Sequence, residues 1–167
     1  RDDDFMITGK RHDFRAEYDV AYDDDGLIKA IRFVQQLRCG YSADLSGAVA
    51  DRQVFHTDNT YYLDIFDIQS LRLKTNTQSN TAFRGFGGPQ GIMAIEYVID
   101  DIARRLGKDP LDVRQRNFYG TTDRNITPYQ MKVEDNVIEP LVRQLEQSAR
   151  YRQRREEIRQ FNAANPV

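Results

Sequence analysis

The chain has 167 residues and a formal net charge of −2, with 40% hydrophobic and 30% charged residues. This composition can supply a core and excludes a disordered segment, and the charge gives no electrostatic basis for binding nucleic acid. The single cysteine, Cys39, excludes an internal disulfide and a metal site built on several thiolates. Together with the lack of an apolar run of membrane-spanning length, it predicts a cytoplasmic protein that binds no membrane.

A long β-hairpin is predicted over residues 14–37. Apolar and polar side chains alternate along its first half, which is the period-two pattern of a half-buried strand, and Asp24-Asp25-Gly26 supplies a turn. We expect a loop with at most a helical turn over residues 39–50, while residues 51–69 fit no single pattern. Another strand is predicted from Leu71 to Thr77.

The strongest helix signal follows Pro89, a residue that suits the first helical position. Apolar residues recur there at spacings of three and four as far as Leu106, and Gly107 is a natural stop. Asp109-Pro110 predicts the cap and start of a second helix that ends near Phe118. Residues 119–136 are expected to be irregular.

Because strands precede helices, we predict an α+β fold in which an N-terminal hairpin or sheet is followed by packed helices. Residues 1–77 are expected to be mainly β-structure and loops, residues 78–91 a glycine-rich loop, and residues 89–163 mainly helical. Residues 137–163 are expected to form one or two further helices, the last of them strongly charged. The chain begins with Arg1 rather than Met, so we expect residues 1–167 to be a single fragment of one domain in a longer polypeptide.

The segment from Asn80 to Gln90 packs three glycines, an arginine and two phenylalanines directly before the strongest helix. Such a turn lets backbone N–H groups approach a ligand, and the helix end favours negative charge. Gln90 stands where a dinucleotide-binding motif has its last glycine, and no P-loop Lys-Ser/Thr follows, so a nucleotide loop is disfavoured. A tight turn with Phe83 and Phe86 in the core remains as good an interpretation.

Arg52 is a second candidate for a functional site, because its neighbours in the sequence are apolar and aromatic. It is either a surface arginine paired with Asp51 or a clamp for an anion or carbonyl group, since a guanidinium offers a fixed fork of donors. The acidic clusters Asp2-Asp3-Asp4 and Asp23-Asp24-Asp25 lack the spacing of an EF-hand calcium loop, so we expect solvated turns there.

Several segments resemble the molybdopterin-binding part of the xanthine dehydrogenase family, in the same order along nearly the whole chain. They are Met6-Ile7-Thr8-Gly9-Lys10-Arg11-His12, Phe55-His56-Thr57-Asp58-Asn59, Thr75-Asn76 with the run from Ser79 to Gly91, and Pro110-Leu111-Asp112-Val113-Arg114-Gln115-Arg116-Asn117. The resemblance implies the fold of the molybdopterin-binding domain of aldehyde oxidases and xanthine dehydrogenases.

The resemblance also implies the chemistry of a parent enzyme. That enzyme would oxidise hypoxanthine and xanthine to urate at a molybdopterin cofactor and pass electrons through 2Fe-2S clusters and FAD to NAD. Its partners would be the purine, the remaining segments of the molybdopterin domain and the iron–sulfur/FAD subunit, in an oligomeric assembly. An aldehyde oxidoreductase of the same superfamily and a non-catalytic interaction module that keeps the fold are the alternatives.

Carried over by position, the family's cofactor contacts fall on Phe83, Arg84 and Gly85. Arg84 would lie near the molybdenum centre without providing a ligand atom, and the glycines would keep the loop slim enough for the cofactor to lie against its backbone. The family's catalytic glutamate lies downstream of this chain. We therefore expect no catalytic residue here, and expect the isolated chain to bind no molybdopterin tightly and to turn over no xanthine.

The implied substrate contacts are Arg52, Ala82 and Phe86. Arg52 would contact the exocyclic oxygen of the purine and offset the charge that develops there, a role that suits a preorganised cation. Phe86 would pack its ring against the flat heterocycle, and Ala82 would border the same cavity.

Overall fold

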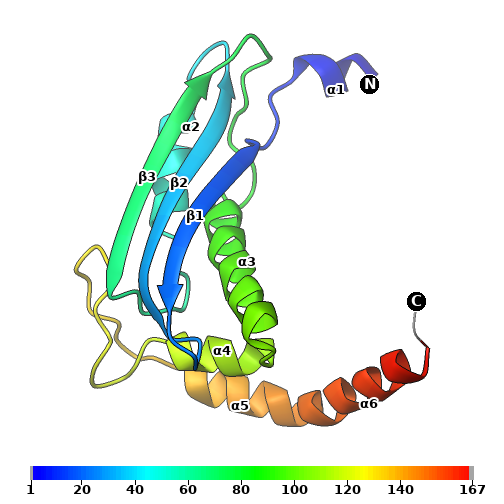
Figure 1. The fold of residues 1–167 in the computed structure, drawn as a ribbon. Helices are drawn as coiled ribbons and strands as arrows, with labels where there is room; N and C mark the ends of the chain where they lie inside the picture. Colours follow the sequence, from blue (N-terminus) through cyan, green and yellow to red (C-terminus); the bar gives the residue numbers. More distant parts are fainter. Residues whose placement is uncertain (1, 166–167) are drawn as a thin grey trace. The chain divides into compact units, whose positions relative to one another are not determined.

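The computed structural model describes residues 2–165, which form two compact units that divide between Val133 and Glu134. The first unit holds a three-stranded sheet and four helices, and the second holds two helices (Figure 1). The elements of the first unit are α1 (Asp2–Ile7), β1 (Phe14–Tyr22), β2 (Ile28–Gly40), α2 (Ser46–Val54), β3 (Ile65–Lys74), α3 (Gly88–Leu106) and α4 (Pro110–Asn117).

The sheet has the order β1-β2-β3. β1 and β2 form the predicted antiparallel hairpin, with Phe14 opposite Leu37 and a turn in which the Gly26 amide donates to the Asp23 carbonyl at 2.8 Å. β3 pairs with β2 in parallel, with Ala30 opposite Ile65. The α+β class predicted from the sequence is confirmed. The sheet is mixed, with one antiparallel and one parallel pair of strands.

Two local predictions between the strands were wrong. The loop expected over residues 39–50 contains the end of β2 and most of α2, and the strand expected from Leu71 starts six residues earlier, at Ile65, and ends at Lys74. Parallel pairing explains both differences, because two parallel strands need a long crossover connection that usually contains a helix. α2 is that crossover helix, and it packs against β2 and β3.

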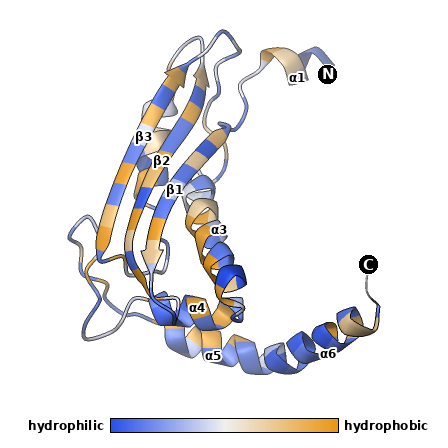
Figure 2. Cartoon of the chain, in the orientation of Figure 1, coloured by the Kyte–Doolittle hydropathy of each residue, from blue (hydrophilic) through white to orange (hydrophobic). Residues whose placement is uncertain are grey.

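The core lies on the face of the sheet that α2 and α3 cover. Alternate residues of β2 are buried there, as the period of a strand requires, whereas their neighbours on the other face are more exposed. Hydrophobic and hydrophilic residues accordingly alternate along the strands (Figure 2). α3 adds a stripe of fully buried side chains at helical spacing, which comprises Ile95, Val98, Ile99, Ile102 and Ala103.

The ends of α3 and α4 follow the predicted signals. α3 stops at Gly107, whose φ of +64° places it in the left-handed region that glycine tolerates. α4 starts after Asp109, whose side chain accepts a hydrogen bond from the Leu111 amide at 2.9 Å. The predicted irregular stretch after Phe118 is also confirmed, since no helix or strand is assigned from there to Val137.

The first helix, α1, was not predicted, because the sequence suggested a solvated turn at Asp2-Asp3-Asp4. These three carboxylates occupy the first turn of α1, where the partial positive charge of a helix N-terminus favours anions. In the second unit, α5 (Ile138–Ser148) and α6 (Tyr151–Ala164) are the further helices predicted after residue 137, and they contact each other. Neither of the two contains a buried residue.

Candidate functional site

The glycine loop, residues 80–87, is the part of the connection between β3 and α3 that leads directly into α3, and it has an unusual backbone. Gly85, Phe86 and Gly87 follow one another with φ values of +95°, +52° and +94°. The left-handed region is open to glycine but disfavoured for a bulky side chain such as that of Phe86. Strain of this kind persists only where the surrounding structure fixes it, and it concentrates at functional sites.

Phe86 is half-buried and packs against a buried cluster formed by Leu37, Cys39, Val49 and Ala50. One side of its ring is therefore anchored in the protein. Phe83, by contrast, is 56% exposed, and Ala82, Arg84 and Gly85 are exposed as well. One interpretation of the sequence placed both phenylalanines in the core. Phe86 packs against the core, but Phe83 does not.

The end of the loop lies directly against α2. A Cβ atom added to Gly87 would stand 2.1 Å from the Val49 carbonyl oxygen, and one added to Gly91 would stand 2.3 Å from that of Gln53. Both distances are far below van der Waals contact. At these two positions the absent side chain therefore makes room for α2.

Arg52 lies on the same helix, one turn after Val49, and its side chain is exposed. Within residues 2–165 it has neither an ion-pair nor a hydrogen-bond partner, because Asp51 pairs with Arg72 of β3 instead. Arg52 is therefore a surface arginine, as one of the two interpretations expected, but the pairing with Asp51 that this interpretation included is wrong. His56 links Arg52 to the loop, since its Nδ1 lies 2.9 Å from the Arg52 carbonyl oxygen and its ring faces Gly88.

The exposed tip of the loop offers hydrogen-bond donors. Within the described part of the chain, the amide groups from Ala82 to Gly85 have no acceptor, and the Arg84 guanidinium has no partner. Consecutive free amides beside an arginine form a surface that suits an anionic or acceptor-rich ligand. The structure thus groups Ala82, Phe83, Arg84, Gly85 and Phe86 beside the helix that carries Arg52.

The sequence did not reveal that a second segment holds this loop. The strap, residues 10–12, runs alongside it: the Lys10 carbonyl accepts from the Thr81 amide at 3.0 Å, and the His12 carbonyl accepts from Gln90 Nε2 at 3.2 Å. Between these two contacts, the Arg11 side chain reaches the tip of the loop. Residues 6–12 carried part of the family resemblance, but no local pattern indicates a partner so distant in sequence.

His12 of the strap is only 3% exposed, and its Nε2 lies 2.8 Å from Ser46 Oγ at the start of α2. Burial lowers the pKa of His12 below its usual value of 6.5, against Asp44 and Asp13, whose charges raise it. The neutral imidazole is therefore the form that the folded protein favours.

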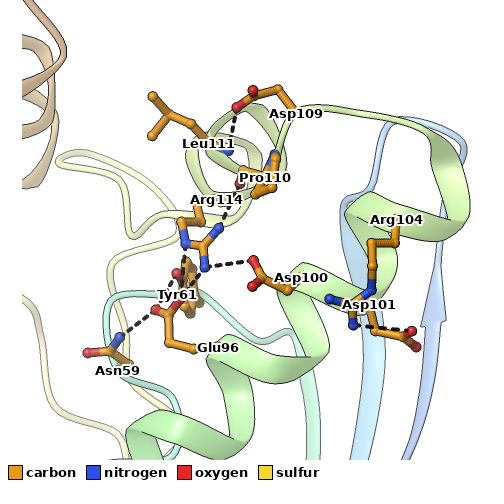
Figure 3. Close-up of polar contacts among 10 residues, drawn as sticks. All are labelled: Asn59, Tyr61, Glu96, Asp100, Asp101, Arg104, Asp109, Pro110, Leu111 and Arg114. Atoms are coloured by element: carbon orange, nitrogen blue, oxygen red, sulfur yellow. Dashed lines mark hydrogen bonds and ion pairs between the residues drawn. The ribbon is translucent and has the colours of Figure 1, made fainter. Parts of the chain in front are cut away.

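A polar network fixes α3, which begins at the glycine loop, to α4 and to the segment before β3 (Figure 3). Arg114 donates to Glu96 at 2.7 Å and to Asp100 at 2.9 Å. The other carboxylate oxygen of Glu96 accepts from Tyr61 Oη at 2.6 Å and from Asn59 Nδ2 at 3.0 Å. Charge-assisted bonds that converge on one carboxylate make this network a rigid support for α3.

Two absences concern residues 2–165. No group of three or more histidine, cysteine, aspartate or glutamate residues in this range could hold a metal ion. Within the same range, no helix has the length and apolar character that crossing a membrane requires.

Known proteins resemble the chain in sequence and in fold. The molybdopterin cofactor-binding domain family matches residues 1–118. Xanthine dehydrogenase of Drosophila pseudoobscura pseudoobscura is 45% identical over 165 residues, and nicotinate hydroxylase of Emericella nidulans is 37% identical over 164 residues. These alignments cover 99% and 98% of this chain, respectively, and 12% of each relative.

Among solved structures, the aldehyde oxidoreductase from Desulfovibrio desulfuricans superimposes with a TM-score of 0.80 at 25% identity, covering 91% of this chain and 17% of that one. The match in fold extends beyond the glycine loop to most of the chain, so the resemblance that the motifs indicated is confirmed. The chain belongs to the molybdopterin cofactor-binding domain family.

Proposed function

We propose that the chain is one wall of the active site of a molybdenum hydroxylase, and that this parent enzyme is a xanthine dehydrogenase. A single observation carries the proposal: Arg52, free of any partner in residues 2–165, lies on the helix against which Phe86 is anchored. The 45% identity with an insect xanthine dehydrogenase supports the choice of substrate.

The loop tip fits the molybdopterin cofactor. Molybdopterin carries a pterin rich in hydrogen-bond acceptors and a phosphate, and the free amides from Ala82 to Gly85 and the Arg84 guanidinium are donors without partners. We assign Phe83, Arg84 and Gly85 to this contact. When bound, the cofactor supplies the oxidation of an electron-poor carbon.

Substrate recognition is assigned to Arg52, Phe86 and Ala82. The exposed side of the Phe86 ring offers a flat apolar surface to a heterocycle, while the buried side keeps it from turning away. The Arg52 guanidinium stabilises negative charge that develops on an exocyclic oxygen of the purine. Such a cation acts most strongly where water is excluded and its position is fixed beforehand.

This chain does not complete the reaction alone. None of its carboxylates is assigned as the catalytic base, because that residue belongs to a downstream segment of the family's polypeptide. The remaining segments of the molybdopterin domain, and a part of the enzyme that carries 2Fe-2S clusters and FAD, would supply the base and the electron path to NAD. The buried free thiol of Cys39 is consistent with a cytoplasmic location.

The decisive variant is Arg52→Met in the full-length enzyme. We expect kcat/KM for xanthine to fall by ~10²–10³, the usual effect of losing one preorganised donor, and kcat/KM for an aromatic aldehyde to fall far less. Steady-state assays with both substrates measure the difference. Arg15→Met is the matched control, because Arg15 lies exposed on β1 and pairs with Glu17.

Equal losses with both substrates would make Arg52 a structural residue and remove the basis for a purine. Faster oxidation of an aldehyde or of nicotinate by the wild-type enzyme would favour the activities that two of the similar proteins carry in their names. A full-length enzyme without any hydroxylase activity would support a non-catalytic module.

A further inference from the structure

We propose that Arg11 is the positioning residue of the glycine loop, holding its tip in the conformation that presents Arg84 and Phe86. Its effect on turnover rests on the proposed function, whereas its effect on the loop does not. Arg11 belongs to the strap that precedes β1, far in sequence from the loop.

The Arg11 side chain makes two different contacts with adjacent residues of the loop. Its Nη2 donates a hydrogen bond to the Arg84 carbonyl oxygen at 2.7 Å, across 73 residues of sequence. The same guanidinium lies over the Phe83 ring, with Cζ 4.4 Å from the ring centroid. A planar, delocalised cation is the group that can both stack on a ring and donate along a fixed direction.

The loop needs such a hold because its own contacts are few. Two backbone hydrogen bonds form locally: the Phe86 amide donates to the Phe83 carbonyl, and the amide of Gly88, the first residue of α3, donates to the Gly85 carbonyl. Between these turns Phe86 keeps its unfavourable φ of +52°, while the side chains before it are exposed. A strained turn relaxes unless contacts from outside fix it. The buried cluster around Leu37 holds the Phe86 ring, and Arg11 holds the exposed residues Phe83 and Arg84 that precede it.

Arg11 is not simply a stabilising surface residue. Its Nη1 is buried beside Gly85 and has no acceptor within the described residues. A buried donor without a partner carries a desolvation cost, so an apolar side chain would fill this space more favourably. The guanidinium therefore serves to set the conformation of the loop and not to increase the stability of the whole protein.

The role of the Arg11 side chain can be tested separately from the backbone hydrogen bonds that the strap makes. The Lys10 and His12 carbonyls hold Thr81 and Gln90 on either side, and substitution at Arg11 leaves both of these bonds available. Lys10→Met is a matched control. The Lys10 ammonium bonds to the Thr8 carbonyl at 2.6 Å and, within residues 2–165, makes no hydrogen bond or ion pair with the loop. The Lys10 carbonyl is unchanged in the variant.

Amide hydrogen exchange of the full-length enzyme reads loop geometry without any turnover. In Arg11→Met, the amides of Phe86 and Gly88 should exchange at least ~10-fold faster than in the wild type, the effect expected from losing a charged hydrogen bond. Arg11→Lys keeps the charge but not the planar fork, so it should restore only part of the protection. Lys10→Met should exchange like the wild type.

Steady-state kinetics of the same proteins test the link to catalysis, using whichever substrate the wild-type enzyme oxidises fastest. We expect kcat/KM to fall ~10-fold in Arg11→Met and less in Arg11→Lys, at equal molybdenum content per subunit. Unchanged exchange of the loop in Arg11→Met overturns the proposal, and so does faster exchange with unchanged kcat/KM. If xanthine proves to be the wrong substrate, the exchange result and the choice of Arg11 stand, so the two proposals fail separately.

Discussion

Single residues show how this chain combines structural and functional demands. Phe86 is both a packing residue of the cluster around Leu37 and a candidate substrate contact, and its left-handed backbone serves both. Most arginines of the first unit form an ion pair or a hydrogen bond through their side chains. The side chains of Arg52 and Arg84 have no such partner in the described residues. A cation left free on a folded surface is available for a ligand.

His12 gives a prediction about pH. Its folded-state pKa lies below the usual 6.5, so in the window just below that value the unfolded chain takes up a proton that the folded chain does not. Stability therefore rises with pH through this window and is lost on acidification, by at most about 1.4 kcal/mol per pH unit for one proton. Denaturant unfolding between pH 5 and pH 8 measures the slope.

His12→Gln is the comparison for this experiment, because the amide can still bond to Ser46 but does not titrate. It should flatten the pH dependence of stability between pH 5 and the usual histidine pKa. The same slope in both proteins would show that another group, and not His12, controls acid stability.

At the scale of elements, the contact between α2 and α3 depends on glycine. Gly91→Ala would place a methyl group 2.3 Å from the Gln53 carbonyl oxygen, although alanine is the better helix former. We expect a loss of about 1–3 kcal/mol in the free energy of unfolding, the usual cost of overpacking. Urea denaturation followed by circular dichroism measures it.

Gly47 provides the control, since it also lies in a helix, α2, but an added Cβ would meet nothing within 4 Å. Gly47→Ala should therefore leave stability unchanged or raise it by about 0.5 kcal/mol. If Gly91→Ala also raised stability, the close approach of the two helices would not be a constraint, and the arrangement of Arg52 beside the loop would need another explanation.

At the scale of the molecule, the two units differ in what stabilises them. Every buried residue identified in the described chain belongs to the first unit, whereas α5 and α6 leave Leu141, Leu145, Ile158 and Phe161 exposed. Helices of 11 and 14 residues without a buried face are marginal in water. We therefore expect the two helices of the second unit to be only marginally stable by themselves.

This difference predicts the outcome of division at Val133. A chain of residues 1–133 should still unfold cooperatively, because it keeps the buried residues that form the core of the first unit. A peptide of residues 134–167 should be only partly helical and should lose its signal gradually on heating. Loss of the cooperative transition from residues 1–133 would show that the second unit supports the first.

Local chemistry in the sequence determined the hairpin, α3, α4 and their ends, because period-two alternation, apolar spacing, Pro89, Gly107 and Asp109 act over a few residues. It also identified the family, through long and specific motifs. These features need no knowledge of distant contacts.

The parallel pairing of β3 with β2, and with it the helix α2, was decided only in the tertiary structure, because strand pairing joins segments that share no local pattern. The same reason applies at the site. Nothing near Arg11 in the sequence points to Arg84, and nothing near Asp51 points to Arg72 rather than Arg52. The sequence alone named the loop, and the fold alone determined which arginine holds it and which remains free.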